Sequence, residues 1–385
     1  MGKIRVIHYC NQLSLGGTER TMEIFCRSLN REKFDVWALA KKHRPDFGAW
    51  LRVNLGLLVG HPKAVAKKKL WDSFFLRQPR LEAALGKNHV IVATNDGDLE
   101  RLILSIGPHI LHIHYSGRAE APLTSDAVAK SVPVIVTTNQ FEIENTSPHH
   151  ASVKRMYFVS RWMLGNKAHW AKNDSRAQVM YNLTDPPEAS DDLRTELGIP
   201  LDAFVIGRVG RADPGIYDPI SVQAVARMQD HRTWFVALNP PHNMIEEART
   251  LGIKHFLAVP ATADSVRLSR YYNTIDVLAH ARRDGETFGC NIAEAMIHRK
   301  PVVTHLTDEM NAQGETAGGG GIVCAKGDVD AYAAALKRLR DDGSYRAKLA
   351  AAAKERADKE FAAAGLVQRL EADYLGLLRA SGIEV

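Results

Sequence analysis

Two glutamates in the segment 282–296 (RRDGETFGCNIAEAM) carry the clearest chemical signal in the sequence. Glu286 and Glu294 are separated by seven residues, and Gly285 and Gly289 place the first of them in a loop. With the second on the helix that follows, two carboxylates can accept hydrogen bonds from hydroxyl groups at both ends of one ligand. The free N–H groups at the start of that helix favour a diphosphate between them. The alternative is an ordinary loop glutamate followed by an exposed helical one.

A glycine pair offers a second, weaker phosphate site. Gly16 and Gly17 follow the first predicted strand and precede the first predicted helix, for which Thr18 is the expected N-cap. Backbone amides can approach a phosphate closely at such a position. A simple tight turn explains the pair equally well. The segment lacks the G-x-G-x-x-G spacing, so it does not favour a nicotinamide dinucleotide.

Two further groupings have the residue types of metal sites. Asp96-Gly97-Asp98 has the D-x-D form, but it follows a strand, where a turn with a helix N-cap is the favoured interpretation. His112 and His114 offer two imidazole ligands, and no third ligand has an obvious spacing. The sequence therefore predicts no metal site.

The elements that position these residues are short apolar runs alternating with helical patterns, which predict parallel sheets. The pattern restarts after the polar segment 184–200, so the sequence predicts two domains, 1–187 and 188–361. Ligands of such sheets bind at the carboxyl ends of the strands, and two domains facing each other would enclose one in a cleft. The predicted strands are 4–9, 34–40, 90–94, 110–114, 132–138, 156–160 and 179–181 in the first domain, and 204–209, 234–238, 255–259, 277–281 and 302–304 in the second.

The composition agrees with a folded, two-domain protein of 385 residues that is 45% hydrophobic and carries a net charge of +6. The positive charge allows a polyanionic partner such as a phosphate, an anionic membrane surface or nucleic acid. No motif supports nucleic acid, which is therefore not expected. The scattered cysteines fit free thiols in the cytoplasm. They are Cys10, Cys26, Cys290 and Cys324.

The segment 50–80 combines aromatic and aliphatic residues with a basic cluster. Trp50 and Trp71 lie among leucines and phenylalanines, and lysines stand at 63 and 67–69, with Arg77 beyond them. A basic amphipathic helix of this kind suits an anionic membrane surface. Two ordinary helices that cover the sheet, with their lysines in solvent, are the alternative.

With these motifs in order, the chain resembles the retaining family-4 glycosyltransferases of the GT-B fold. The segment 282–296 is similar to the E-x₇-E motif of that family. Other similar segments run through nearly the whole chain: GGTER at 16–20, ILHIHY at 110–115, VMYNLTDP at 179–186, VGRADPG at 209–215, KPVVTH at 300–305 and ETAGGGGIV at 315–323. The resemblance implies an α/β fold of two Rossmann-like domains, with residues 362–385 forming a helix that packs back on the first domain.

The resemblance also implies roles for individual residues. Glu286 is expected to contact hydroxyls of the transferred sugar, Glu294 the ribose, and Arg211 the diphosphate. His114 is expected near the reacting sugar, with His112 the weaker candidate. His114, Glu286 and Arg211 are thus the expected catalytic residues. The backbone amides expected along the sugar and the diphosphate are those of Gly16, Gly17, Phe288, Gly289 and Cys290.

The reaction implied is metal-independent transfer of a hexose from a nucleoside-diphosphate sugar, with retention of configuration, to a glycan or lipid-linked acceptor. No cofactor is expected beyond this co-substrate. The setting implied is cell-surface glycan or glycolipid assembly, in the cytoplasm or peripherally on the inner face of the membrane. One position departs from the family, because Ile216 stands where a lysine is usual. This keeps open a non-catalytic protein of the same fold, and a sugar-nucleotide epimerase is the third possibility.

Overall fold

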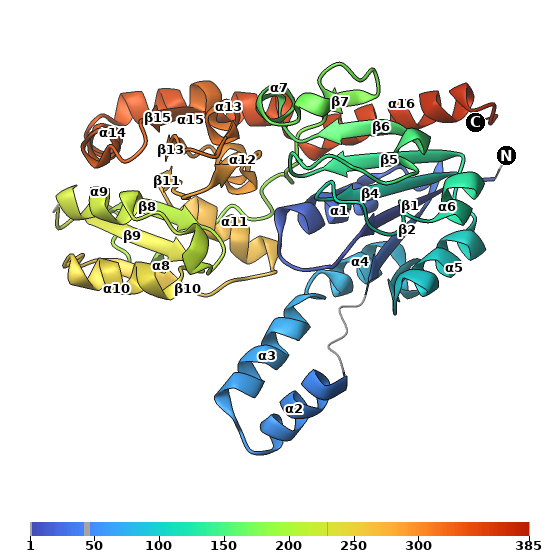
Figure 1. Ribbon diagram of the computed structural model, residues 1–385. Helices are drawn as coiled ribbons and strands as arrows, with labels where there is room; N and C mark the ends of the chain where they lie inside the picture. Colours follow the sequence, from blue (N-terminus) through green and yellow to red (C-terminus); the bar gives the residue numbers. More distant parts are fainter. Residues whose placement is uncertain (1, 42–46, 229, 385) are drawn as a thin grey trace. The chain divides into compact units, whose positions relative to one another are not determined.

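The computed structural model describes residues 2–41, 47–228 and 230–384 (Figure 1), and the chain divides into two compact units. The first consists of Met1–Val159, Lys167–Met180 and Val367–Val385, and the second of Ser160–Asn166 and Tyr181–Leu366. Both are α/β units built on a parallel sheet, as the alternation of strands and helices predicts.

The first unit contains a seven-stranded sheet in the order β3-β2-β1-β4-β5-β6-β7. All neighbouring strands are parallel, and the order reverses between β1 and β4. The strands are β1 (Ile4–Cys10), β2 (Phe34–Lys41), β3 (Val90–Ala93), β4 (Ile110–Tyr115), β5 (Val134–Asn139), β6 (Val153–Phe158) and β7 (Ala177–Val179). The helices are α1 (Gly17–Ser28), α2 (Phe47–Leu58), α3 (Pro62–Ser73), α4 (Gln78–Leu85), α5 (Asp96–Ile106) and α6 (Asp126–Ser131), with most of α16 (Ala363–Ala380).

The second unit contains a six-stranded parallel sheet in the order β10-β9-β8-β11-β13-β15 and a small two-stranded one, β12-β14. The strands are β8 (Phe204–Val209), β9 (Thr233–Leu238), β10 (Phe256–Val259), β11 (Val277–Ala279), β12 (Gly285–Glu286), β13 (Val302–His305), β14 (Met310–Asn311) and β15 (Gly321–Cys324). The helices are α7 (Arg161–Asn166), α8 (Arg194–Leu197), α9 (Ile220–Met228), α10 (His242–Thr250), α11 (Ser265–Thr274), α12 (Cys290–Ile297), α13 (Ala312–Ala317), α14 (Val329–Asp341) and α15 (Gly343–Glu360).

The unit boundaries lie slightly away from the predicted domain boundaries. The second unit already begins at Tyr181, whose hydroxyl donates to Glu315 Oε1 (2.6 Å), and Asn182 Nδ2 donates to Cys290 Sγ (3.6 Å). Within the first unit, α16 places Tyr374 OH 2.5 Å from His112 Nδ1, and Asp373 accepts hydrogen bonds from Arg155. These contacts hold the C-terminal helix on the sheet of the first unit.

Two helix starts test the predictions from local sequence. α1 begins at Gly17 with Gly16 as its N-cap, so the expected Thr18 cap is wrong. Gly16 carries no capping side chain, and Glu19 folds back over it instead. At α5 the predicted turn is confirmed, because Asn95 caps the helix by accepting from Asp98 N (2.9 Å).

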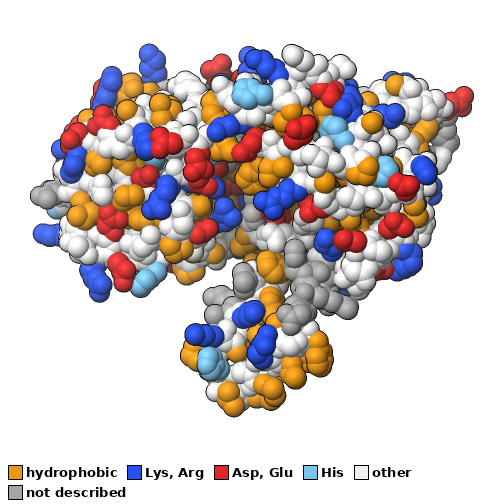
Figure 2. Space-filling view, viewed as in Figure 1, with side chains coloured by type: hydrophobic (Ala, Val, Ile, Leu, Met, Phe, Trp, Pro, Cys, Tyr) orange, Lys and Arg blue, Asp and Glu red, His pale blue; other side chains and the backbone are white. Residues whose placement is uncertain are grey.

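The segment 50–80 forms a hairpin, α2–α3, that stands away from the sheet of the first unit (Figure 1). α2 buries Ala49 and Val53 and exposes an apolar stripe on its other side. Figure 2 shows hydrophobic side chains over much of this hairpin, with basic ones among them. The exposed stripe consists of Phe47 (75% exposed), Trp50 (47%), Leu51 (40%), Leu55 (55%) and Leu58 (82%).

Not every basic residue of this segment belongs to its exposed surface. Arg77 does not belong to the exposed cluster, because it is buried and its guanidinium donates to Glu23 on α1 (2.7 Å). The side chain of Lys69 lies outside the described residues. Within the described chain, no helix is both long and apolar enough to cross a bilayer.

Candidate functional site

The candidate site lies in the second unit, where the strand order reverses between β8 and β11. Open parallel sheets bind ligands outside the carboxyl ends of their strands at such a reversal. β8 ends at Val209 and leads to Arg211, while β11 leads to His280 and onward to Glu286. Fold topology alone therefore brings the predicted arginine and the first predicted glutamate to the same edge of the sheet.

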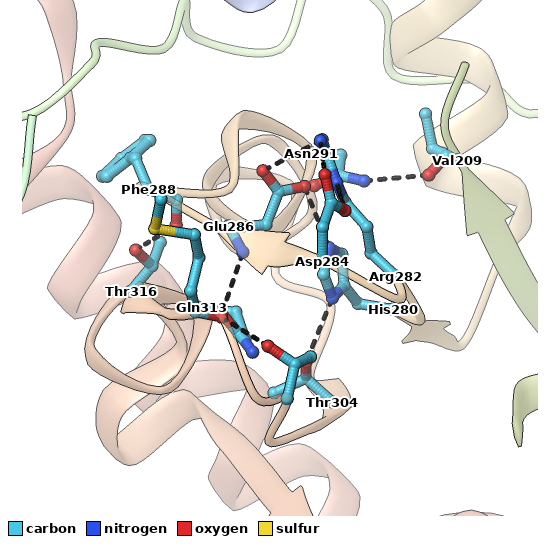
Figure 3. Close-up of polar contacts among 12 residues, drawn as sticks. Val209, His280, Arg282, Asp284, Glu286, Phe288, Asn291, Thr304, Gln313 and Thr316 are labelled. Carbon is cyan, nitrogen blue, oxygen red and sulfur yellow. Dashed lines mark hydrogen bonds and ion pairs between the residues drawn. The ribbon is translucent and has the colours of Figure 1, made fainter. Parts of the chain in front are cut away.

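Glu286 lies at the centre of a network of polar side chains (Figure 3). Its Oε1 lies 3.2 Å from His280 Nε2, and its Oε2 accepts from Arg282 (3.4 Å). Its backbone N–H donates to Gln313 Oε1 (3.1 Å). Arg282 also donates to both carboxylate oxygens of Asp284. The carboxylate of Glu286 is thus fixed by two side chains rather than free in solvent.

This network keeps Glu286 ionised. Burial by itself raises the pKa of Glu286, but the hydrogen bond from His280 and the positive charges of Arg282 and Arg211 outweigh burial, and the pKa lies below its usual value of 4.5. An ionised carboxylate only accepts hydrogen bonds, so Glu286 can bind the hydroxyl groups of a sugar. Since Arg282 is already paired with two carboxylates, its charge is largely neutralised within the network.

The segment from β12 to the start of α12 is held in one shape, so Glu286 lies on a short strand rather than in the predicted loop. Gly285 has φ +69°, and a Cβ there would lie 1.6 Å from Met310 O, so only glycine fits. Phe288 is buried, and its ring packs against Phe361 at 5.2 Å between centroids. Gly289, at φ 96°, is the N-cap of α12, and no side chain caps this helix. The start of α12, including Cys290, therefore has the geometry that favours a negatively charged group.

Glu294 lies on α12, as predicted, but it is buried rather than exposed. Its Oε2 accepts a hydrogen bond from Tyr272 OH (2.7 Å), a residue of α11. The alternative of an exposed helical glutamate is therefore wrong. The fixed carboxylate still offers an acceptor, as hydrogen bonding to a ribose requires.

Arg211 is exposed in the loop after β8. Its positive charge is near enough to Glu286 to contribute to the lowered pKa of that carboxyl. Ile216 closes the same loop, and its backbone carbonyl accepts from Arg283 N (3.0 Å). The structure thus brings together, in the second unit, the predicted site residues Arg211, Glu286, Phe288, Gly289, Cys290 and Glu294.

The remaining predicted residues belong to the first unit. Gly16 and Gly17 lie at the start of α1, after β1. A Cβ on Gly16 would lie 2.2 Å from Glu19 Oε2, and Glu19 Oε1 accepts from Gln12 (2.8 Å) and Ser14 (2.9 Å). A carboxylate therefore lies beside the glycine pair that the sequence assigns to phosphate binding.

His114 and His112 lie buried on β4 and contact a third histidine, which the sequence analysis missed. His8 on β1 pairs in register with His112, and His8 Nδ1 lies 3.0 Å from His114 Nε2. His112 contacts Tyr374 OH through Nδ1 and Thr138 Oγ1 (2.7 Å) through Nε2. Burial lowers the pKa of all three, that of His8 to about 3, so they are neutral.

The three imidazoles each present a possible ligand atom, all within 4.8 Å of one another. Four of their six ring nitrogens take part in hydrogen bonds, with each other, Tyr374 or Thr138, while His8 Nε2 and His114 Nδ1 are buried without a partner among the described residues. His114 has less than 2% of its surface exposed.

Sequence analysis also missed the residues that orient Glu286. His280 and Arg282 come from the loop between β11 and β12, and Gln313 comes from α13, so no single local motif contains all three. The one available signal was position, since His280 lies near the end of the predicted strand 277–281 and Arg282 begins the segment 282–296.

Comparison with known proteins places a family match on the second unit. Residues 190–356 match the family model described as "Glycosyl transferases group 1". Two curated relatives are D-inositol 3-phosphate glycosyltransferases, from Thermomonospora curvata (28% identical over 178 residues) and Kineococcus radiotolerans (27% over 186 residues). Each alignment covers 43% of this chain, and 41% and 42% of the two relatives, so it spans less than half of either relative.

Solved structures match the chain over nearly its whole length. Anabaena HepE, in complex with UDP and glucose, is 16% identical with a TM-score of 0.68, covering 96% of this chain and 99% of that one. A glycosyltransferase from Rickettsia africae is 14% identical with a TM-score of 0.67, covering 98% and 99%. The similarity at these identities concerns the fold. The predicted fold class, α/β with two Rossmann-like domains of the GT-B type, is confirmed, and the cleft between them stays a prediction.

Proposed function

We propose that this chain is a glycosyltransferase that moves a hexose from a nucleoside-diphosphate sugar to an acceptor hydroxyl, with retention at the anomeric carbon, as family-4 enzymes do. The observation that carries the proposal is the second-unit site. There an ionised Glu286 and a buried Glu294 flank the uncapped start of α12, next to Arg211. These groups lie within the segment that matches the glycosyltransferase family model.

The parts of a nucleotide sugar correspond to these groups in order. Glu286 accepts hydrogen bonds from hydroxyls of the hexose, and Glu294 accepts from the ribose. The amides of Phe288, Gly289 and Cys290, together with Arg211, offset the charge of the diphosphate. The same charges stabilise the diphosphate more strongly as it leaves, which is where transition-state charge develops.

In the proposed reaction, the acceptor oxygen forms a bond to the anomeric carbon as the bond from that carbon to the diphosphate oxygen breaks. The acceptor proton passes to a phosphate oxygen of the leaving group. The protein then contributes positioning and electrostatic stabilisation rather than a general base. His114 is proposed to lie near the reacting sugar, with Gly16 and Gly17 binding phosphate from the first unit, and no metal ion or further cofactor is used.

The decisive experiment measures release of nucleoside diphosphate from UDP-glucose, GDP-mannose and ADP-glucose, with and without glycan or lipid-linked acceptors. UDP-glucose comes first, because HepE was crystallised with UDP and glucose. NMR of the product decides between retention and inversion. The variant Glu286→Gln should lose activity, whereas Glu246→Gln, at an exposed position on α10, should not. Binding of a nucleotide without any turnover would favour the non-catalytic alternative, which Ile216 motivates, and an altered free sugar nucleotide would favour an epimerase.

We also propose that the α2–α3 hairpin binds the cytoplasmic face of an anionic membrane, in cell-surface glycan or glycolipid assembly. The exposed stripe of α2 supplies the apolar contact, and Lys63 and Lys67 on α3 are exposed beside it. Apolar side chains that enter the headgroup region and lysines that attract anionic lipids reinforce each other. A lipid-linked acceptor would be reached from this surface.

A further inference from the structure

Arg208 is a buried positive charge without a counter-ion among the described residues. It lies near the end of β8, only 3% exposed, and its side chain makes no hydrogen bond or ion pair within that part of the chain. Its Nη1 is fully buried and unpartnered. Its backbone is well held, since Tyr271 OH both accepts from Arg208 N and donates to Arg208 O, each at 3.0 Å. Because arginine cannot give up its proton in a protein, the charge itself is buried.

The surroundings of Arg208 compensate this charge only in part. Burial lowers the pKa of Arg208, while Tyr271, Tyr217 and Glu286 act in the opposite direction. Glu286 is already bonded to His280 and Arg282, and Arg282 repels Arg208. An uncompensated buried charge is costly, so its presence points to an anion that is bound during function.

The backbone of Gly210 packs directly against the guanidinium of Arg208. A Cβ on Gly210 would lie 2.8 Å from Arg208 Nη1 and 2.9 Å from both Cζ and Nη2. Any other residue would therefore cover the charged end of Arg208. Gly210 directly follows β8, so this end of Arg208 lies at the carboxyl end of the strand, next to the loop that carries Arg211.

The start of α12 is tied to this place. Asn291, in its first turn, donates through Nδ2 to Val209 O (2.8 Å), the residue that directly follows Arg208 (Figure 3). An anion at the uncapped start of α12 therefore lies close to the end of β8. Helix amides and a guanidinium at one place form a strong phosphate site.

We propose that Arg208 binds the diphosphate of the nucleotide, reaching it past Gly210. This rests on the proposed function and names the residue that supplies the second positive charge beside Arg211. Ile216 supplies no charge at the position where the family usually has a lysine.

The test is isothermal titration of the full chain with UDP, GDP and ADP and with the corresponding nucleosides. For the diphosphate that binds, Arg208→Met should weaken binding about 10- to 100-fold, as loss of a charge-assisted hydrogen bond does, and leave nucleoside binding unchanged. Gly210→Ala, whose methyl group would cover the guanidinium, should weaken diphosphate binding too, but not further in the Arg208→Met background. Arg249→Met, at an exposed arginine of α10, is the control.

Thermal unfolding without ligand separates a binding role from a structural one. Met fills a similar volume without a charge, so Arg208→Met should leave the melting temperature unchanged or raise it. A lower melting temperature with unchanged diphosphate affinity would show that Arg208 is structural and overturn the inference. If the wild type binds UDP, GDP or ADP and Arg208→Met binds equally well, only this inference fails. If the wild type binds none of the three, the proposed function fails with it.

Discussion

His280 Nε2 lies 3.2 Å from Glu286 Oε1, and this contact decides which ring nitrogen of His280 faces the carboxylate. Since the pKa of Glu286 is lowered, its carboxylate is ionised and can only accept, so His280 Nε2 carries a proton. His280 Nδ1 lies 3.0 Å from Thr304 Oγ1. The imidazole, which follows β11, is thus tied to β13 through Thr304 and contacts the carboxylate of Glu286 through Nε2.

The first prediction concerns this carboxylate. Glu286→Gln replaces an ionised acceptor by a neutral amide, so kcat/KM for sugar transfer should fall about 10- to 100-fold. Glu294→Gln should act mainly on KM, because the ribose is bound equally before and during the reaction. Steady-state kinetics with the active sugar nucleotide measures both, and an unchanged kcat/KM in Glu286→Gln would exclude its proposed role.

The second prediction concerns β12, the short strand that carries Glu286. Gly285→Ala combines an unfavourable positive φ with a clash against Met310 O, so it should lower the free energy of unfolding by at least about 1–3 kcal/mol. Gly343→Ala, in α15 with open space around it, is the matched control and should be neutral or slightly stabilising. Urea unfolding measures both, and equal midpoints would contradict the prediction.

The third prediction is a pH dependence of stability from the buried histidines. His8, His112 and His114 stay neutral in the folded protein, whereas in the unfolded chain they take up protons near pH 6.5. The unfolded state therefore binds more protons below that pH, and stability falls as the pH drops from about 6.5 towards the folded pKa values. Each histidine contributes up to about 1.4 kcal/mol per pH unit.

Urea unfolding at pH 7.5, 6.5 and 5.5 tests this dependence. The free energy of unfolding should fall less steeply with decreasing pH in His8→Gln, because this change removes one of the three titrating groups. His231→Gln, whose side chain is exposed, should leave the slope unchanged. A slope that is the same in wild type and His8→Gln would show that His8 is protonated in the folded protein.

The fourth prediction concerns metal removal. The groups proposed to bind the diphosphate are helix amides and arginines, so EDTA should leave the rate of sugar transfer unchanged. Rates are compared before and after chelation, and again after Mg²⁺, Mn²⁺ or Zn²⁺ is added. The prediction would be contradicted if EDTA abolished activity and one of these ions restored it. His8, His112 and His114 would then be the candidate metal ligands.

The fifth prediction concerns the hairpin. Leu55→Glu and Leu58→Glu place charges in the exposed stripe of α2, so both should reduce co-sedimentation with vesicles of phosphatidylcholine and phosphatidylglycerol. Leu201→Glu, at an isolated leucine that is 86% exposed in the second unit, is the matched control. Binding should weaken at high salt. If both hairpin variants bind like the wild type, the membrane contact lies elsewhere.

Local signals in the sequence predicted the seven strands of the first sheet and five of the six strands of the second, but missed its edge strand β15 and the small β12-β14 sheet. β8 runs from Phe204 to Val209 as predicted, because its apolar run is bounded clearly on both sides. β12 was missed, since a strand of two residues has no periodicity. The E-x₇-E segment identified both glutamates, and Glu294 lies on a helix, α12, as predicted.

The histidine cluster shows why the rest was out of reach. His8 is far from His112 and His114 along the chain, so no spacing pattern connects the three. It lies beside them only because β1 pairs with β4 in the sheet. Likewise, Arg77 is buried against Glu23 because α4 packs on α1. The sequence around Arg77 is basic and does not predict this burial. In both cases tertiary packing, rather than local pattern, decided the outcome.

The helix α16 has a consequence for the order in which the protein matures. The strands of the first unit are synthesised before the second unit, yet Tyr374 and Asp373, which contact His112 and Arg155 of the first unit, are added only after the whole second unit. The second unit can therefore complete its contacts during translation while the first still lacks a helix. A chain truncated after Leu366, the last residue of the second unit, should therefore have a second unit that resists protease and a first unit that is cleaved.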